Sequence, residues 1–240
     1  MDSNLNKDLR TANPYGFGSG AATTLQVRNR VLRNTYWLLA LSLIPTVIGA
    51  WIGVSFNFAG VMAARPGMTL MVFLVGAFGL MFAVQKFKDS GIGVALLLAF
   101  TFFMGVMLSG LLARILGFSN GVALISMAFG GTAVIFGAMA TIATVSKRDF
   151  SGLGKWLMIG AVVILVAALA NFFLQLPALM LTISVLAIVI FSAFMLYDVQ
   201  RVVNGGETNY VTATLAIYLD IYNVFSNILA LLGIFGGSRD

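Results

Sequence analysis

The side chains that could carry proton or metal chemistry in this chain are carboxylates. Its 240 residues include eight aspartates and glutamates but no cysteine and no histidine. The sequence therefore offers no thiolate nucleophile, no disulfide and none of the usual zinc or haem ligands. Any proton chemistry must use the carboxylates, and most of these lie in polar stretches where a solvated side chain is expected.

Asp220 is an exception, because it lies near the middle of the apolar run 210–235. An ionised aspartate at mid-membrane costs about 2.5–3.5 kcal/mol on insertion scales, so it must be neutral, paired or hydrated. Asn223 and Asn227 follow at i+3 and i+7, which places three polar side chains on one face of a helix. The pattern predicts either a functional site or a protonated aspartate that hydrogen-bonds a neighbouring helix.

Asp198 closes the preceding apolar run, and Arg201 at i+3 can pair with it. The polar turn 204–209 joins the two runs, so Asp198 and Asp220 should project from adjacent antiparallel helices with an axial offset of about 9 Å. Two carboxylates in a low-dielectric bundle are expected to share one proton near neutral pH.

The elements that position these residues are membrane spans. Hydrophobic residues make up 60% of the chain and charged residues 9%, against about 45–50% and 25% in soluble domains. This composition excludes a soluble enzyme, a disordered chain and a disulfide scaffold, and predicts an all-α polytopic membrane protein. At about 20 apolar residues per span, the sequence predicts seven spans, at 36–56, 68–85, 91–113, 122–145, 156–174, 179–197 and 210–235. Pro177 lacks an N–H, which predicts a tight turn between the fifth and sixth spans.

The basic residues predict the orientation of the spans. Eleven of the fourteen lie on the side of the N-terminus, and three (Arg65, Arg114 and Arg239) lie on the other side. The positive-inside rule then places the N-terminus in the cytoplasm and the C-terminus outside the plasma (inner) membrane. The charge excess is explained by topology and contact with the lipid bilayer, so no nucleic-acid partner is expected. Residues 1–27, which contain no signal peptide, are predicted to form a flexible cytoplasmic tail before a transmembrane domain at 28–240.

Several strings resemble the Bax inhibitor-1 (TMBIM) family. YDVQ at 197–200 and LAIYLDIYNVF at 215–225 are similar to its last two spans. VLRNTY at 31–36, FLQLPAL at 173–179 and GGETNY at 205–210 are similar to its bacterial YccA-like branch. The resemblance runs from about residue 28 to the end. It implies a seven-helix bundle with the last helix at its centre, and the same orientation as the charge pattern.

The resemblance implies two alternative functions. Some members conduct a pH-sensitive Ca²⁺ leak gated by an aspartate pair, which corresponds to Asp198 and Asp220 here. Those members close the pair with an arginine in the second span; this chain has none there, and Arg201 and Lys86 are the candidate cations. The YccA-like branch is instead associated with the membrane AAA protease FtsH, as a slow substrate that interferes with it. Neither function is enzymatic, and neither implies a cofactor beyond weakly bound Ca²⁺.

Paired aspartates on adjacent spans also occur in intramembrane aspartyl proteases. Those enzymes need Gly-x-Gly-Asp at the second aspartate, so that the substrate backbone can approach. This chain has bulky residues at those positions, in the string Ile217–Tyr218–Leu219–Asp220. We therefore set proteolysis aside.

Overall fold

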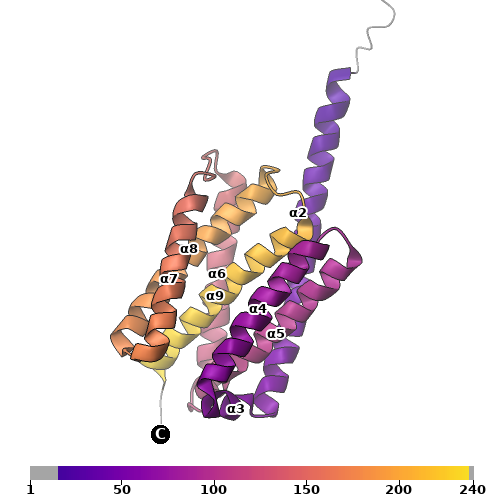
Figure 1. Cartoon of the computed structure of the whole chain (residues 1–240). Coiled ribbons are helices and arrows are strands. Elements are labelled where there is room, and N and C mark those ends of the chain that lie inside the picture. Colours follow the sequence, from indigo (N-terminus) through magenta and orange to yellow (C-terminus); the bar gives the residue numbers. More distant parts are fainter. Residues whose placement is uncertain (1–15, 238–240) are drawn as a thin grey trace, which may run out of the picture.

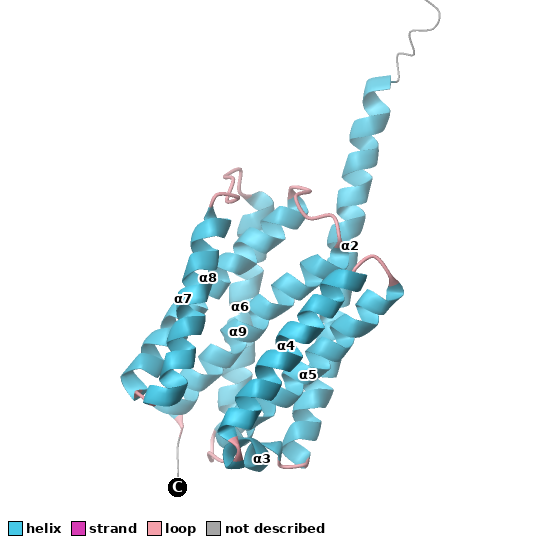
Figure 2. Ribbon diagram, viewed as in Figure 1, coloured by secondary structure: helices cyan, strands magenta, loops and turns pink. Residues whose placement is uncertain are grey.

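The computed structural model describes residues 16–237, with side chains described from Gln26 onward. Within this part of the chain every regular element is a helix (Figures 1 and 2). The helices are α2 (Gly16–Ser55), α3 (Phe58–Ala64), α4 (Pro66–Phe87), α5 (Gly91–Leu116), α6 (Gly121–Val145), α7 (Leu153–Leu174), α8 (Pro177–Val203) and α9 (Tyr210–Gly236). Seven of them are long and apolar enough to cross a membrane, which confirms the predicted spans. The short helix α3 was not predicted.

The last helix lies at the centre of the bundle. α9 packs against α8, α6, α2, α5 and α4, whereas α7 packs only against α8 within the described residues. Figure 1 shows α9 passing between the α4–α5 pair and the α7–α8 pair. Ten residues of α9 are buried, compared with one in α7. The central position predicted for the seventh span is therefore confirmed.

Two glycines let α2 and α5 approach each other closely. A Cβ atom on Gly105 of α5 would meet the backbone of Thr46 in α2. A Cβ atom on Gly49 of α2 would meet the backbone carbonyl of Phe102 in α5. The two helices therefore pack backbone against backbone, as small residues allow inside membranes.

The loops divide the bundle into two ends. We call the end that carries residues 88–90, 146–152 and 204–209 the basic end. The opposite end carries residues 117–120, 175–176 and 237, and we call it the C-terminal end. The turn at 175–176 confirms the predicted break: α7 ends at Leu174, Gln175 takes a left-handed conformation with φ of 51°, and Pro177 is the first residue of α8.

The first helix is longer than the membrane requires. α2 has 40 residues and begins at Gly16, so residues 16–27 of the predicted tail are helical here. At 1.5 Å per residue its length is about 60 Å, compared with about 30 Å for a hydrocarbon core. Figure 1 shows its first half rising out of the bundle at the basic end. Residues 1–15 of the predicted tail lie outside the described residues.

Replacing Gly105 with alanine tests the close packing of α2 and α5. We expect Gly105→Ala to lower the free energy of unfolding by about 1–3 kcal/mol, because the methyl group must push the two backbones apart. Gly79→Ala is the matched control, since a Cβ atom at Gly79 of α4 would meet nothing within 4 Å. Reversible unfolding in detergent measures both. Equal stabilities of the two variants would contradict the backbone contact.

Candidate functional site: the Asp198–Asp220 pair

Asp198 of α8 and Asp220 of α9 meet inside the bundle. Asp220 is 4% exposed, and the side chain of Asp198 is 11% exposed. The two carboxyl groups are close enough to interact directly. The structure therefore brings together the two residues that the sequence analysis singled out.

The directions of the Asp198 and Asp220 side chains explain how they meet, although the two residues lie at different positions along the bundle axis. Asp198 lies five residues before the end of α8, whereas Asp220 lies ten residues after the start of α9. Every Cα–Cβ bond in a helix tilts toward the helix N-terminus. Because α8 and α9 are antiparallel, Asp198 leans away from the basic end and Asp220 leans toward it. The two carboxyl groups therefore approach each other along the bundle axis.

A hydrogen bond between two carboxyl groups requires a proton on one of them. The Oδ2 atom of Asp220 is buried and has no hydrogen-bond partner among the described residues. An unsatisfied buried polar atom costs about 1–3 kcal/mol, so this oxygen is a favourable position for a further proton, a water or a cation.

Arg201 is the cation that faces the pair. Its guanidinium lies 3.5 Å from Asp198 through Nη1 and 3.4 Å from Glu207 through Nη2. It also lies over the Tyr197 ring, 5.6 Å from the ring centre. The Arg201 side chain is 40% exposed, so it links the buried pair to the surface of the basic end. The predicted Asp198–Arg201 pairing is present, and Glu207 is a second partner that was not predicted.

The turn between α8 and α9 is held in shape by its own polar groups. Gly205 has a φ of 78°, a conformation that glycine adopts without strain. Asn209 caps α9 by accepting hydrogen bonds from the N–H groups of Val211 and Thr212. Its side-chain N–H group donates to Asp89 at 2.7 Å and to the Lys88 carbonyl at 3.2 Å. The turn is thereby tied to the loop between α4 and α5.

Gln200, two residues after Asp198, attaches a third loop to the same end of α8. Its side-chain oxygen accepts from the Phe150 N–H, and its amide nitrogen donates to the Arg148 carbonyl, both at 2.7 Å. Gln200 is only 4% exposed, so both ends of its amide are satisfied within the protein. In the same loop, hydrogen bonds from the backbone and the hydroxyl of Ser151 hold the pKa of Asp149 below its usual value. The sequence analysis did not identify this role of Gln200.

Two tyrosines hold other parts of α9 in place. The hydroxyl of Tyr218 lies 2.9 Å from the Thr46 hydroxyl of α2. The hydroxyl of Tyr222 donates to the Met104 carbonyl of α5 at 3.3 Å. These hydrogen bonds fix the rotation of α9, and so fix the direction in which Asp220 points.

The other predicted site residues do not bond to the pair. Asn223 and Asn227 each donate 2.8 Å hydrogen bonds to carbonyls one turn earlier in α9. Lys86 is exposed on α4, with its ammonium 5.7 Å from the centre of the Phe87 ring. Among the described residues no cluster of three or more acidic, histidine or cysteine side chains could hold a metal ion. A cation at the pair would therefore have two protein carboxylates at most and would need water for its remaining ligands.

Comparisons with known proteins agree with the predicted family. The family model described as "Inhibitor of apoptosis-promoting Bax1" matches residues 28–237. The chain is 40% identical over 218 residues to "Modulator of FtsH protease YccA" of Escherichia coli K12. The aligned residues cover 91% of this chain and 95% of that protein. "Inner membrane protein YccA" of another E. coli strain matches equally well. An uncharacterized membrane protein of Vibrio cholerae is 35% identical over 86% of this chain and 90% of its own length.

The attachment of the 146–152 loop to α8 can be tested with Gln200→Ala. We expect the free energy of unfolding to fall by about 1–3 kcal/mol, because the buried Gln200 amide loses two hydrogen bonds worth about 0.5–1.5 kcal/mol each. Hydrogen exchange at the Phe150 amide should accelerate. Gln85→Ala is the control, because Gln85 is exposed on α4 near the same end. Unchanged exchange at Phe150 would contradict the proposed attachment.

Proposed function

The chain belongs to the Bax inhibitor-1 family, and from this premise we propose that it is a bacterial inner-membrane protein that leaks cations, Ca²⁺ being the candidate ion. The leak would be gated by the proton occupancy of Asp198 and Asp220. The observation that carries the proposal is the burial of these two neighbouring carboxyl groups inside the bundle. The proposed orientation follows the basic residues, with the basic end in the cytoplasm.

The gate would work through charge repulsion in a medium of low dielectric constant. With one proton between them, the two carboxyl groups carry a net charge of −1, which Arg201 partly neutralises. Loss of that proton places two negative charges in contact, and they repel strongly because little water screens them. Among the described residues, the charged side chain that interacts with Asp220 is Asp198, whereas Asp198 also interacts with Arg201 and Glu207. Repulsion would therefore displace α9 from α8 and open four carboxylate oxygens to a passing cation.

Weak binding is compatible with conduction. A Ca²⁺ ion at the separated pair would obtain its remaining ligands from water. A site that holds the ion loosely lets it leave again, whereas a complete protein cage would retain it. The proposal therefore predicts transport without tight or stoichiometric Ca²⁺ binding.

A second candidate function is modulation of the FtsH protease. It is supported by the 40% identity to the YccA protein that is named for this activity. An ATP-driven membrane protease needs a handle on its substrate, and the polar N-terminal segment would supply one at the cytoplasmic end of α2. This function requires neither ion flux nor the aspartate pair.

Flux measurements at two pH values test the proposed gate. In liposomes that contain a Ca²⁺ indicator, we expect flux through the wild-type protein to rise with pH, by at most about tenfold per unit for a single proton. Asp220→Asn should abolish this pH dependence, because it retains the shape of the side chain and removes the titration. Asp198→Asn should do the same, and the double variant should show no further change, because the pair acts as one unit.

Asp149→Asn is the matched control for the flux experiment. It makes the same chemical change at an exposed aspartate of the 146–152 loop, outside the pair. It should leave both flux and pH dependence intact. A pH profile that survives Asp220→Asn would exclude the gate and leave FtsH modulation as the function.

Removal of residues 1–27 tests the second candidate. If the N-terminal segment is the handle, the truncated protein should no longer slow the degradation of another FtsH substrate, while the leak in liposomes persists. The measurement is the turnover of that substrate in cells that express either form at equal levels. Interference that is independent of residues 1–27 would exclude the segment as the handle.

A further inference from the structure

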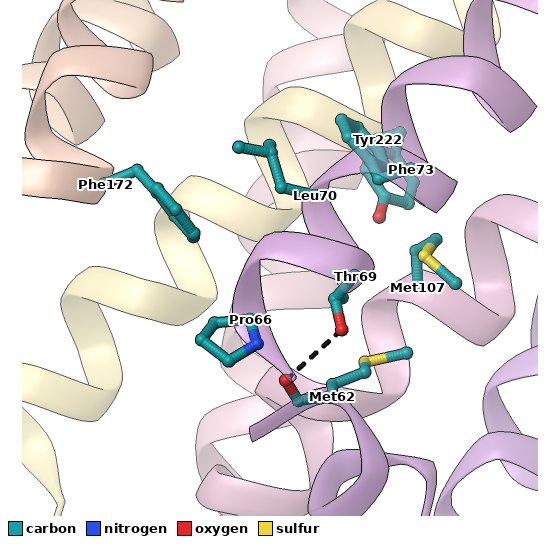
Figure 3. A pocket seen from close by; sticks show the side chains of 8 residues that line it. All are labelled: Met62, Pro66, Thr69, Leu70, Phe73, Met107, Phe172 and Tyr222. Carbon is teal, nitrogen blue, oxygen red and sulfur yellow. Dashed lines mark hydrogen bonds between the residues drawn. The ribbon is translucent and has the colours of Figure 1, made fainter. Parts of the chain in front are cut away.

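A groove opens at the C-terminal end between α4 and the α7–α8 turn. It consists of two cavities, of about 300 and 770 Å³, which share Pro66 and Phe172 as lining residues. In Figure 3, Phe172 points from α7 toward Leu70 of α4, and Tyr222 lies beyond Leu70. The cavities therefore form one continuous groove, which we call the α4–α7 groove.

The groove exists because α9 separates two groups of helices. Among the described residues, α4 packs against neither α7 nor α8. Figure 1 shows α4 and α7 on either side of α9. α9 contributes Ile234 at the outer part of the groove and Tyr222 at its inner limit. The floor of the groove is thus the central helix itself.

The length of the groove matches one leaflet of a bilayer. Tyr222 and Ile234 are twelve residues apart, which corresponds to about 18 Å along a helix. Half of a hydrocarbon core is about 15 Å. A partner helix that crosses the membrane would need a surface about twice as long. A molecule that occupies one leaflet, namely a lipid, fits this length.

The polar groups of the groove lie where a lipid carries its headgroup. Arg114, in the last turn of α5, lines the larger cavity together with Asn171 and Gln175. Arg114 is exposed and forms no ion pair within residues 26–237. The smaller cavity is lined mainly by apolar side chains, including Leu70, Phe73 and Met107. The part of the groove near Arg114 complements an anionic headgroup, and its apolar part complements an acyl chain.

We propose that the α4–α7 groove binds one anionic phospholipid. Its phosphate would pair with the Arg114 guanidinium, which matches a phosphate in geometry. One acyl chain would run along α9 as far as Tyr222. The lipid would fill the gap between the two groups of helices and pack against the helix that carries Asp220. This proposal does not depend on the proposed leak.

Native mass spectrometry of the full-length protein can count the bound lipid. The protein is purified, depleted of lipid, and titrated with phosphatidylglycerol or phosphatidylcholine carrying identical acyl chains. We expect one phosphatidylglycerol per chain to bind about tenfold more tightly than phosphatidylcholine. Arg114→Gln should remove this preference, because a charge-assisted hydrogen bond to the phosphate is lost.

Two further variants distinguish a built site from general attraction. Arg65→Gln removes an exposed charge at the same end, outside the lining of both cavities, and should leave the preference intact. Leu181→Trp should reduce binding of both lipids by filling the larger cavity. Equal losses in Arg114→Gln and Arg65→Gln would overturn the proposal, because the attraction would then be diffuse. Equal affinities of the wild-type protein for the two lipids would also overturn the proposal. So would a purified protein that binds neither lipid and instead holds a helix of another protein in the groove.

Discussion

The hydrocarbon core of a membrane offers no hydrogen-bond partner to a polar side chain, and this constraint determines the position of α9. The helix carries Asp220 as well as Thr214 and Tyr218, all of them buried. At the lipid surface these groups would lose their partners at a cost of several kcal/mol each. At the centre of the bundle, α8 supplies Asp198 and α2 supplies Thr46 as partners. The other spans are arranged so that this helix is covered at the level of its polar groups.

Much of this arrangement follows from patterns that a sequence displays directly. The number of spans and the Pro177 turn depend on local composition, and both were predicted correctly. The approach of Asp198 to Asp220 was also predicted, although the 9 Å offset counted only the rise along each helix. The lean of side chains toward the helix N-terminus supplies the missing distance. This rule is general, so the offset could have been corrected from the sequence alone.

Other contacts could not be predicted, because they depend on how distant segments pack. Gln200 bonds a loop 50 residues earlier in the chain, and Asn209 bonds one about 120 residues earlier. Neither spacing leaves a signal in a single sequence. Lys86 was expected near the pair because it ends the second span, but α4 presents it at the surface. As a result, the 146–152 loop is tied to the end of α8 and the 88–90 loop to the start of α9, so a separation of α9 from α8 would also separate these two loops.

The length of α2 has a mechanical consequence. One continuous helix joins the N-terminal segment to the interface with α5, where Gly49 and Gly105 bring the two backbones together. A force applied at the start of α2 is carried along this helix to its interface with α5. It loads the α2–α5 interface in shear, so that contacts along its whole length must yield together rather than one after another. The chain therefore resists extraction from this end far more than a helix that could be peeled away turn by turn.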